Sequence, residues 1–356
     1  MKPLICFYEN EQYIFSTDYR HIPCPAELSV EIFLEQIEKV FFDELKVVQV
    51  NFEAGHEELF CDKISLYKSS KAQVFIFNHF KLKTLSDVVQ NDCATALAFQ
   101  SLVSRNEFIE KTNFIVEEIK KGRIYQVNLT SPLKGFSDLS GEELFAKYKN
   151  LFTGDYKALL PSDNYDLLSF SPELFLEQKN GTLITRPIKG SQAVGAPFSE
   201  QLEKSKKEEA ELSMIVDLLR NDLNSLSSDK DAIVTKHREK MQLGYIQHTF
   251  SEIAVKSELS LSEVLTKTLP GGSISGCPKI ESLRVINEVE KYKRQAYTGI
   301  LGWWKKNEFG LNITIRSFIK AGDELFYHAG CGIVYDSDPE SEWQEFLLKT
   351  GALNVR

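Results

Sequence analysis

The sequence contains no apolar run that approaches the roughly 20 residues needed to cross a bilayer. It also lacks a basic surplus, because 42 lysines and arginines stand against 51 aspartates and glutamates, a formal net charge of −9. Nucleic-acid and anionic-membrane binders carry basic faces, so this balance argues against both classes. Tyr8, Glu9 and Asn10 interrupt the apolar N-terminal stretch, which excludes the pattern of a secretory signal. We therefore expect a cytoplasmic protein that binds neither nucleic acid nor membrane.

Close pairs of metal-binding or redox residues are also missing. The six cysteines lie far apart, and the six histidines include no pair at helical i, i+4 spacing. Zinc and redox motifs need such pairs, so reduced and mostly buried thiols are expected. Gly276-Cys-Pro-Lys279 does not match a Walker A loop, and "GCGIVY" at 330–335 lacks the third glycine of a dinucleotide fingerprint.

The pattern of apolar residues predicts one large α+β domain over residues 1–356. Short apolar strands dominate 1–100, with one helix near 30–44, and the candidate chemistry lies in 101–356. Further helices are expected at 101–121, 198–224 and 260–267, after Pro278 and from Pro339, with runs of strands between them. Such runs favour a layered architecture over regular βαβ winding.

Two predicted helices each carry a pair of carboxylates three residues apart. Glu208 and Glu211 share one helix face, and Glu342 and Glu345 share another that Lys349 extends. Oxygen ligands from two helices could together hold one hard cation such as Mg²⁺, completed by an anionic substrate. The alternative is that both pairs lie on ordinary solvated helix faces.

Several single residues allow both a functional and a structural interpretation. The glycine-rich loop 269–279 could bind an anion through free backbone N–H groups or simply form a turn. Arg316 lies in a predicted strand, where it needs a carboxylate from protein or substrate. His248 is compatible with a core histidine, Glu173 with a strand-end carboxylate, and Lys189 in "TRPIKGS" with a surface lysine beside a turn.

Eight blocks between about residue 102 and 353 follow one another in a characteristic order: "YQVNL", "SPELF", "TRPIKGS", "KEEAELSMIVDLLRNDL", "LPGGSISGCPK", "AYTGILGWW", "TIRSF" and "GCGIVYDSDPESEWQEFLLK". With these blocks the chain resembles the chorismate-utilising enzymes. The resemblance implies a layered α/β sandwich of two antiparallel sheets with outer helices, and an active site between the sheets.

The resemblance implies a role for each candidate residue. Glu211 and Glu345 would bind Mg²⁺, with Glu208 and Glu342 in support, and Glu173 would be the general acid that protonates the departing C4 hydroxyl of chorismate. The other positions implied to contact substrate are Gln126, His248, Gly272, Ser273, Tyr297, Arg316, Gly330, Gly332 and Lys349.

Two positions indicate which branch of the family the chain resembles. Gln126 stands where members that add water carry a lysine base, and glutamine is typical of members that use ammonia. Lys189 in "PIKG" and the "PGGSI" loop are typical of enzymes that make 4-amino-4-deoxychorismate, a precursor of 4-aminobenzoate and folate. We hypothesise that Lys189 attacks C2 of chorismate before ammonia adds at C4.

Two alternatives remain open, namely an enzyme that forms anthranilate and a non-catalytic chorismate-binding paralogue. No glutaminase signature is visible, because Cys93 lacks the glycine-flanked setting of an amidotransferase nucleophile. A separate glutamine amidotransferase subunit is therefore the expected source of ammonia.

Overall fold

The computed structural model describes residues 2–88, 97–152, 154–193, 206–229, 231–243, 246–350 and 353–355. At 88, 190–193, 206–211, 242–243, 246–247 and 354–355 it describes the backbone alone. Within these ranges no helix is both long enough and apolar enough to pass through a membrane.

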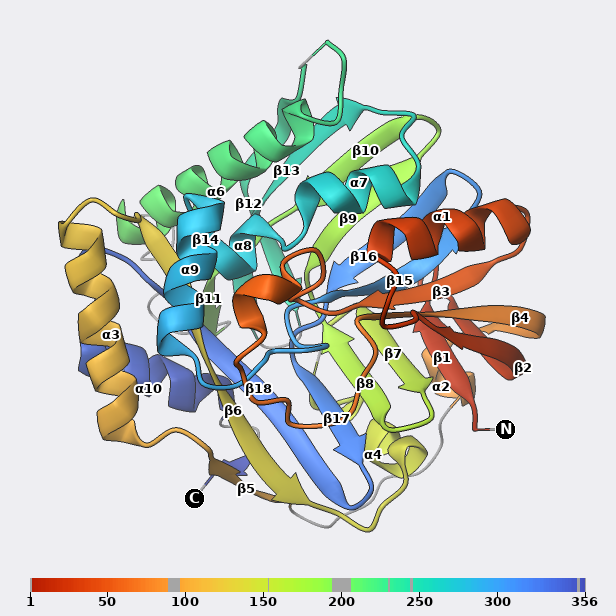
Figure 1. Ribbon diagram of the computed structural model, residues 1–356, viewed down its shortest axis with the longest axis horizontal. Coiled ribbons are helices and arrows are strands. Elements are labelled where there is room, and N and C mark those ends of the chain that lie inside the picture. Colours follow the sequence, from red (N-terminus) through yellow and green to blue (C-terminus); the bar gives the residue numbers. More distant parts are fainter. Residues whose placement is uncertain are drawn as a thin grey trace.

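The strands form one continuous hydrogen-bonded ladder (Figure 1), and every pairing is antiparallel except that of β19 with β5. Neighbours along the ladder are β5 (Ala98–Ser101), β6 (Gln126–Phe136), β18 (Glu324–Ile333), β17 (Ser317–Ala321), β8 (Asp166–Ser171), β7 (Tyr156–Pro161), β1 (Leu4–Phe7), β2 (Tyr13–Pro23), β4 (Ala72–Lys83), β3 (Lys46–Val50), β15 (Ile300–Lys305), β16 (Glu308–Ile313), β9 (Leu174–Lys179), β10 (Thr182–Arg186) and β13 (Ile246–Lys256). β11 (Ile188–Ala193) and β12 (Ile233–Leu243) both pair with β13, β14 (Gly276–Cys277) pairs with β6, and β19 covers Asn354–Val355.

The predicted α+β class with antiparallel strands is confirmed, and the pairings connect the expected two sheets into one ladder. The N-terminal strands are part of it, because β1 pairs with β7 and β3 pairs with β15. Large apolar side chains such as Trp303, Trp304 and Phe318 are almost completely buried in the core. Burial of this apolar surface is the main force that holds the layers together.

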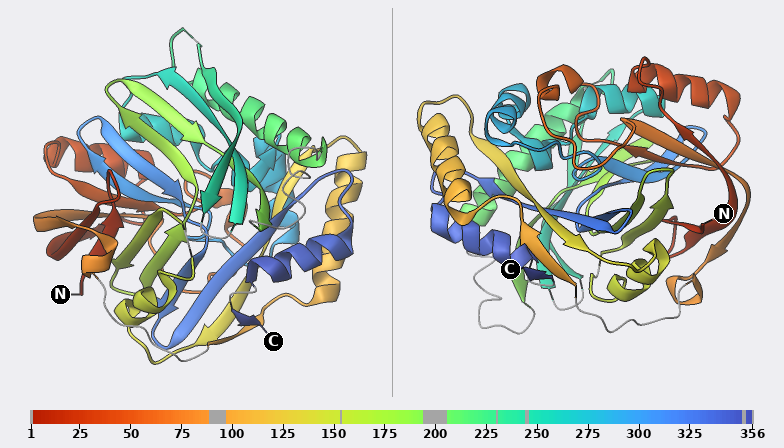
Figure 2. Two further views of the ribbon diagram at one scale, coloured as in Figure 1. Left: turned by 180° about the vertical axis from the view of Figure 1, so that it is seen from behind. Right: turned by 60° about the horizontal axis from the view of Figure 1, so that its bottom comes forward.

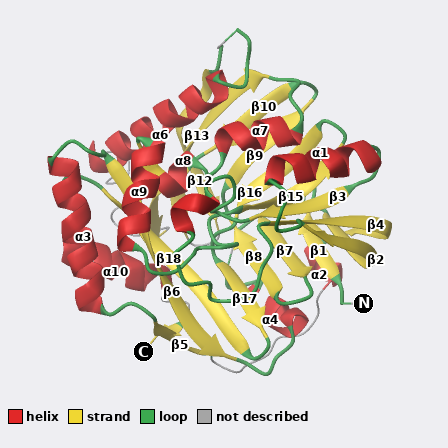
Figure 3. Cartoon of the chain, viewed as in Figure 1, coloured by secondary structure: helices red, strands yellow, loops and turns green. Residues whose placement is uncertain are grey.

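Helices cover the ladder and are coloured red in Figure 3. α6 packs on β11, β12 and β13, α9 packs on β6, and α10 packs on α3 and β18. Figures 1 and 2 show α3 and α10 together at the β6–β18 end, while α6, α7 and α1 cover the other end. The helices are α1 (Val30–Val40), α2 (Leu85–Val88), α3 (Arg105–Lys120), α4 (Gly141–Tyr148), α6 (Lys206–Asn224), α7 (Leu261–Thr268), α8 (Gly272–Ser275), α9 (Lys279–Val289) and α10 (Pro339–Thr350), with a 3₁₀ turn η1 (Glu57–Phe60).

Side-chain caps fix several helix starts. Ser104 accepts a hydrogen bond from the N–H of Glu107, so α3 begins at Arg105, four residues later than the apolar pattern predicts. Asp338 accepts the N–H of Ser341, as expected for the N-cap of the last helix. The cap satisfies backbone donors that the first helical turn leaves unpaired.

The chain leaves regular strand structure at two places that lie opposite each other in the ladder. β8 ends at Ser171 and β9 starts at Leu174, and likewise β16 ends at Ile313 and β17 starts at Ser317. At each break the chain crosses from one part of the ladder to another, because β8 pairs with β17 whereas β9 pairs with β16. We call these two breaks the crossings. The prediction that Arg316 lies within a strand is therefore wrong: it lies in the crossing, with a φ of 50°.

The cysteines that the structure describes are free thiols. Cys6, Cys24 and Cys331 are buried, Cys277 is half-buried and Cys61 is exposed. The expectation of reduced, mostly buried thiols agrees with this part of the chain, and Cys93 lies outside the described residues.

Candidate active site

Glu173 lies at the crossing between β8 and β9 and is buried, with 7% of its surface exposed. Its backbone carbonyl accepts the N–H of Ile313, and the carbonyl of Arg316 accepts the N–H of Phe170. These two hydrogen bonds join the two crossings. They bring Glu173 and Arg316, which are 143 positions apart in the sequence, to the same level of the ladder.

The Glu173 carboxylate accepts a hydrogen bond of 2.9 Å from Ser273 in α8. Burial raises the pKa of the Glu173 carboxyl, and the charges of Lys189 and Arg316 together with the Ser273 bond offset only part of that rise. A buried carboxyl with a raised pKa retains its proton more readily near neutral pH, which suits a general acid.

Lys189 is half-buried on β11, opposite Thr249 of β13. The Thr249 hydroxyl donates to the backbone carbonyl of Lys189 at 2.9 Å, which fixes the strand at this residue. His248, next to Thr249, is buried with 2% exposure. Among the effects that oppose burial, the charge of Lys189 is the largest on the pKa of the Glu173 carboxyl, so the predicted amine lies within electrostatic range of the predicted acid.

From His328 to Ile333, β18 has one edge with which no described strand pairs, and this edge is available to a ligand. Gly330 lies opposite Thr130 of β6, but Thr130 donates its N–H to Glu290 instead of to β18. The Gly330 carbonyl accepts a bond of 2.8 Å from Lys349, and pairing with β17 ends at Tyr327. Because alternate residues of an antiparallel strand direct their N–H and C=O groups to the same edge, the N–H groups of Gly330 and Gly332 point away from β6.

Gln126, the first residue of β6, is next to this edge. A Cβ added at Gly332 would lie only 2.9 Å from the Gln126 side-chain nitrogen, so the end of this side chain reaches the backbone of β18. Gln126 is 1% exposed, and its Oε1 has no hydrogen-bond partner among the described residues. A buried amide oxygen without a donor is costly, so this atom is a good acceptor for a bound ligand.

Tyr297 stacks on His328 with ring centroids 5.0 Å apart and an interplanar angle of 14°. Burial raises the pKa of the Tyr297 phenol, although Arg294 and Lys349 lower it in part. Burial, with a smaller contribution from Arg294, lowers the pKa of His328 to about 3. A protonated phenol on a neutral imidazole can donate a hydrogen bond to a carboxylate.

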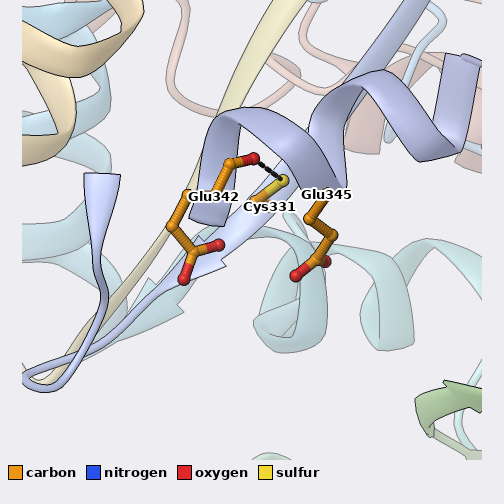
Figure 4. A group of neighbouring side chains, drawn as sticks. All are labelled: Cys331, Glu342 and Glu345. Carbon is orange, nitrogen blue, oxygen red and sulfur yellow. Dashed lines mark hydrogen bonds between the residues drawn. The ribbon is translucent and has the colours of Figure 1, made fainter. Parts of the chain in front are cut away.

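The carboxylates of Glu342 and Glu345 project to the same side of α10, with the sulfur of Cys331 beside them (Figure 4). One possible ligand atom from each of these three residues lies within 4.8 Å of the others. Ser337 donates to Glu342 at 2.7 Å, and Lys349 forms an ion pair with Glu345 at 2.7 Å. The side chains of Glu208 and Glu211 in α6 lie outside the described residues, so the structure describes only the α10 pair of the carboxylates that are predicted to bind Mg²⁺.

Gly272 begins α8 directly against α6. A Cβ there would approach the Leu218 side chain to 2.6 Å, so the glycine lets α8 bring Ser273 to Glu173. Sequence reasoning missed the buried pair Glu290 and Arg294 behind this loop. The only local signal is their i, i+4 spacing, which is more typical of a helix surface.

An open cavity of about 320 Å³ lies near the N-terminal strands instead, between Tyr8, Asp43, Phe77 and Lys305. It contains no predicted site residue. The site is therefore defined by its convergent side chains and strand edge and not by this cavity.

This arrangement of a buried acid, a lysine and a strand edge without a described partner strand agrees with the comparison to protein families. The chain matches the chorismate binding enzyme family over residues 30–354. It therefore belongs to that family, as the eight sequence blocks predict.

Individual relatives carry two different names. Anthranilate synthase component 1 3 of Haloarcula marismortui is 33% identical over 273 residues, which cover 74% of this chain and 54% of that protein. Aminodeoxychorismate synthase component 1 of Bacillus subtilis is 25% identical over 350 residues, 90% of this chain and 73% of that protein. The chain thus spans about half the length of the first relative, at 54%.

A solved structure shows the same fold. Anthranilate synthase component I from Streptococcus pneumoniae superposes with a TM-score of 0.85 at 21% identity, over 97% of this chain and 93% of that chain.

We predict that His328 makes folding stability depend on pH. Its folded pKa of about 3 lies below the ordinary value, so the unfolded chain binds more protons and stability falls as pH drops below about 6.5. At pH ~5 the loss attributable to His328 is about 2 kcal/mol. Urea unfolding measures the drop in the free energy of unfolding between pH ~7.5 and ~5. This drop should be smaller in His328→Phe than in the wild type by about 2 kcal/mol. The control His79→Phe, at an exposed position, should behave as the wild type, and an equal loss in both variants would contradict the prediction.

Proposed function

We propose that this protein is an aminodeoxychorismate synthase component I, which converts chorismate and ammonia into 4-amino-4-deoxychorismate for 4-aminobenzoate and folate synthesis. The observation that carries the proposal is Lys189, whose charge acts on the buried acid Glu173. Family members with lysine in the "PIKG" block make this product. The Bacillus subtilis relative, which aligns over 90% of the chain, has this name.

In the proposed chemistry the nitrogen lone pair of the Lys189 amine is the nucleophile. Its Nζ forms a bond to C2 of chorismate while the ring double bond shifts and the C4–oxygen bond breaks. Glu173 donates its proton to the departing hydroxyl, which leaves as water because hydroxide is a poor leaving group. Ammonia then forms the C4–nitrogen bond, the double bond returns, and the C2–Nζ bond breaks. The surplus proton on nitrogen goes back to the Glu173 carboxylate, so the cycle balances.

The remaining residues would hold chorismate in place. Tyr297, Arg316 and the N–H groups of Gly330 and Gly332 suit the pyruvyl carboxylate, because they offer donors and positive charge. The free Oε1 of Gln126 suits a donor such as ammonia. Lys349 suits the ring carboxylate. Bringing reactants into contact in one orientation supplies much of the acceleration in such reactions.

Mg²⁺ is part of this proposal. Glu342 and Glu345 supply hard oxygen donors on one side of α10, which fit the cation, whereas the Cys331 sulfur does not. Glu208 and Glu211 would contribute from α6. When bound, the ion would neutralise the ring carboxylate of chorismate.

A separate glutamine amidotransferase subunit is the proposed source of ammonia in the cell. Formation of anthranilate is the second candidate function, and it is favoured by the identity of 33% to the Haloarcula marismortui relative.

One assay tests the proposal. The purified protein is incubated with chorismate, Mg²⁺ and ammonium, with and without added aminodeoxychorismate lyase. We expect 4-aminobenzoate only when the lyase is present. Anthranilate without lyase would support the second candidate function, and unchanged chorismate would contradict both enzymatic functions in favour of a binding paralogue.

Replacement of Lys189 separates a covalent role from an electrostatic one. Lys189→Ala should lower kcat by at least about 1,000-fold, because the covalent route is lost, while chorismate still binds. Lys189→Arg keeps the charge without an available nucleophile and should be equally inactive. Steady-state kinetics and calorimetric titration with chorismate measure both effects. Substantial activity in Lys189→Arg would show that the lysine acts through its charge.

Loss of one metal-binding carboxylate should weaken Mg²⁺ binding. Glu345→Gln removes a charged oxygen ligand, and we expect the Kd for Mg²⁺ to rise by at least about tenfold. The matched control is Glu340→Gln in the first turn of the same helix, where Glu340 pairs with Arg105. Calorimetric titration of the free protein gives the Kd without relying on turnover. Equal affinities in the two variants would exclude Glu345 as a ligand.

A further inference from the structure

A buried ion pair lies directly behind the candidate site. Arg294 is 1% exposed and Glu290 is 6% exposed; Glu290 is the C-cap of α9, and Arg294 lies four residues later in the loop that follows the helix. The guanidinium donates to the carboxylate twice, from Nη2 at 2.6 Å and from Nε at 2.9 Å. Its carbon also lies 4.4 Å from the centre of the Phe52 ring. A charge this deeply buried is retained only where its hydrogen bonds are satisfied.

The pair completes the edge of β6 that no described strand covers at this level. Arg294 donates from Nη2 to the carbonyl of Asn128 at 2.6 Å, and Glu290 accepts the N–H of Thr130 at 2.9 Å and its hydroxyl at 3.0 Å. Asn128 and Thr130 lie opposite Gly332 and Gly330 across the ladder. The ion pair thus fixes the strand that supports the anion-binding edge.

The same guanidinium also holds the loop that carries Ser273. Nη1 of Arg294 donates to the carbonyl of Ile274 at 2.8 Å, and the Asn128 amide donates to that carbonyl at 3.2 Å. Ile274 directly follows Ser273, which donates to the acid Glu173. Planar bidentate recognition of this kind is specific to arginine, because a lysine ammonium cannot span the same acceptors.

We propose that Arg294 is a positioning residue for the chorismate reaction: it holds Ser273 against Glu173 and the Gly330–Gly332 edge in register at the same time. The proposal rests on the proposed function only in taking Glu173 as the acid. In this proposal Arg294 affects the protonation of Glu173 through Ser273, and it affects the affinity for chorismate through the Gly330–Gly332 edge.

The first test measures the Glu173 carboxyl directly. The Ser273 bond and the charges of Lys189 and Arg316 lower the pKa of Glu173 against the effect of burial, so losing the bond should raise that pKa further. A ¹³C-glutamate NMR titration, assigned with Glu173→Gln, follows the group. We expect an upward shift in Ser273→Ala and in the double variant Arg294→Met/Glu290→Met, which removes both charges together. The triple variant, which combines Ser273→Ala with Arg294→Met and Glu290→Met, should show the same Glu173 pKa shift as Ser273→Ala alone.

Kinetics then supply the second test. In the double variant we expect kcat to fall by about 10–100-fold, as for other groups that orient a reactive residue. KM for chorismate should rise, and the alkaline limb of the pH profile should move to higher pH. Arg294→Lys should reproduce these changes, because the charge remains but the planar fork is lost. Circular dichroism checks the fold of the double variant before the kinetics, because the change also removes the partners of the Thr130 N–H and the Asn128 carbonyl.

Two outcomes would overturn the proposal. One is a folded double variant in which the pKa of Glu173 and the pH limb are unmoved, which would leave Arg294 a purely structural role. The other is a triple variant in which the shift in the Glu173 pKa exceeds that of Ser273→Ala alone, because Arg294 would then act on Glu173 by another route than Ser273. The rate is measured as disappearance of chorismate, so a wild-type product of anthranilate would refute the proposed function without affecting this test. The NMR titration needs no turnover at all.

Discussion

At the level of Gly330 and Gly332, no described strand pairs with the outer edge of either β6 or β18, and the candidate site is organised around these two edges. A buried backbone donor or acceptor without a partner is expensive, so each edge needs another source of hydrogen bonds. The β6 edge obtains them from Glu290 and Arg294. Among the described residues, the β18 edge receives Lys349 at the Gly330 carbonyl, and the N–H groups of Gly330 and Gly332 are the ones proposed to bind substrate. The ion pair therefore fixes the edge of β6, and this supports the edge of β18 that is proposed to bind substrate.

The crossings at Glu173 and Arg316 place opposite charges where two parts of the ladder exchange strands. A backbone there is freed from regular pairing, and its side chains can project into the space between layers. Arg316 adopts a φ of 50°, which is unusual for a residue with a Cβ. Strained backbone of this kind is often found at functional sites. Catalytic groups on such crossings are held from both sides by strands and need no mobile loop to position them.

Much of this arrangement was accessible from sequence, because the eight blocks and the carboxylate spacing are local patterns. The failures have a physical pattern too. Around Arg316, the β-branched residues Ile313 and Ile315 predict an unbroken strand, since local propensity does not reveal which partner each half will meet. Arg294 lies in the basic stretch "KYKRQ", which is typical of a solvated surface. Its burial depends on carbonyl groups of β6 and α8 that only the folded chain brings near.

The contacts that build the site are almost all distant in the chain. Ser273 and Glu173 are 100 residues apart, Asn128 and Ile274 are 146 apart, and Arg294 and Asn128 are 166 apart. Loops of this length are slow to close, so contacts of high sequence separation form late in folding. The capacity to bind substrate consequently appears only once the whole ladder is closed. Ligand binding to this protein would then report the completed native state, and ligand would stabilise that state against every partly folded form.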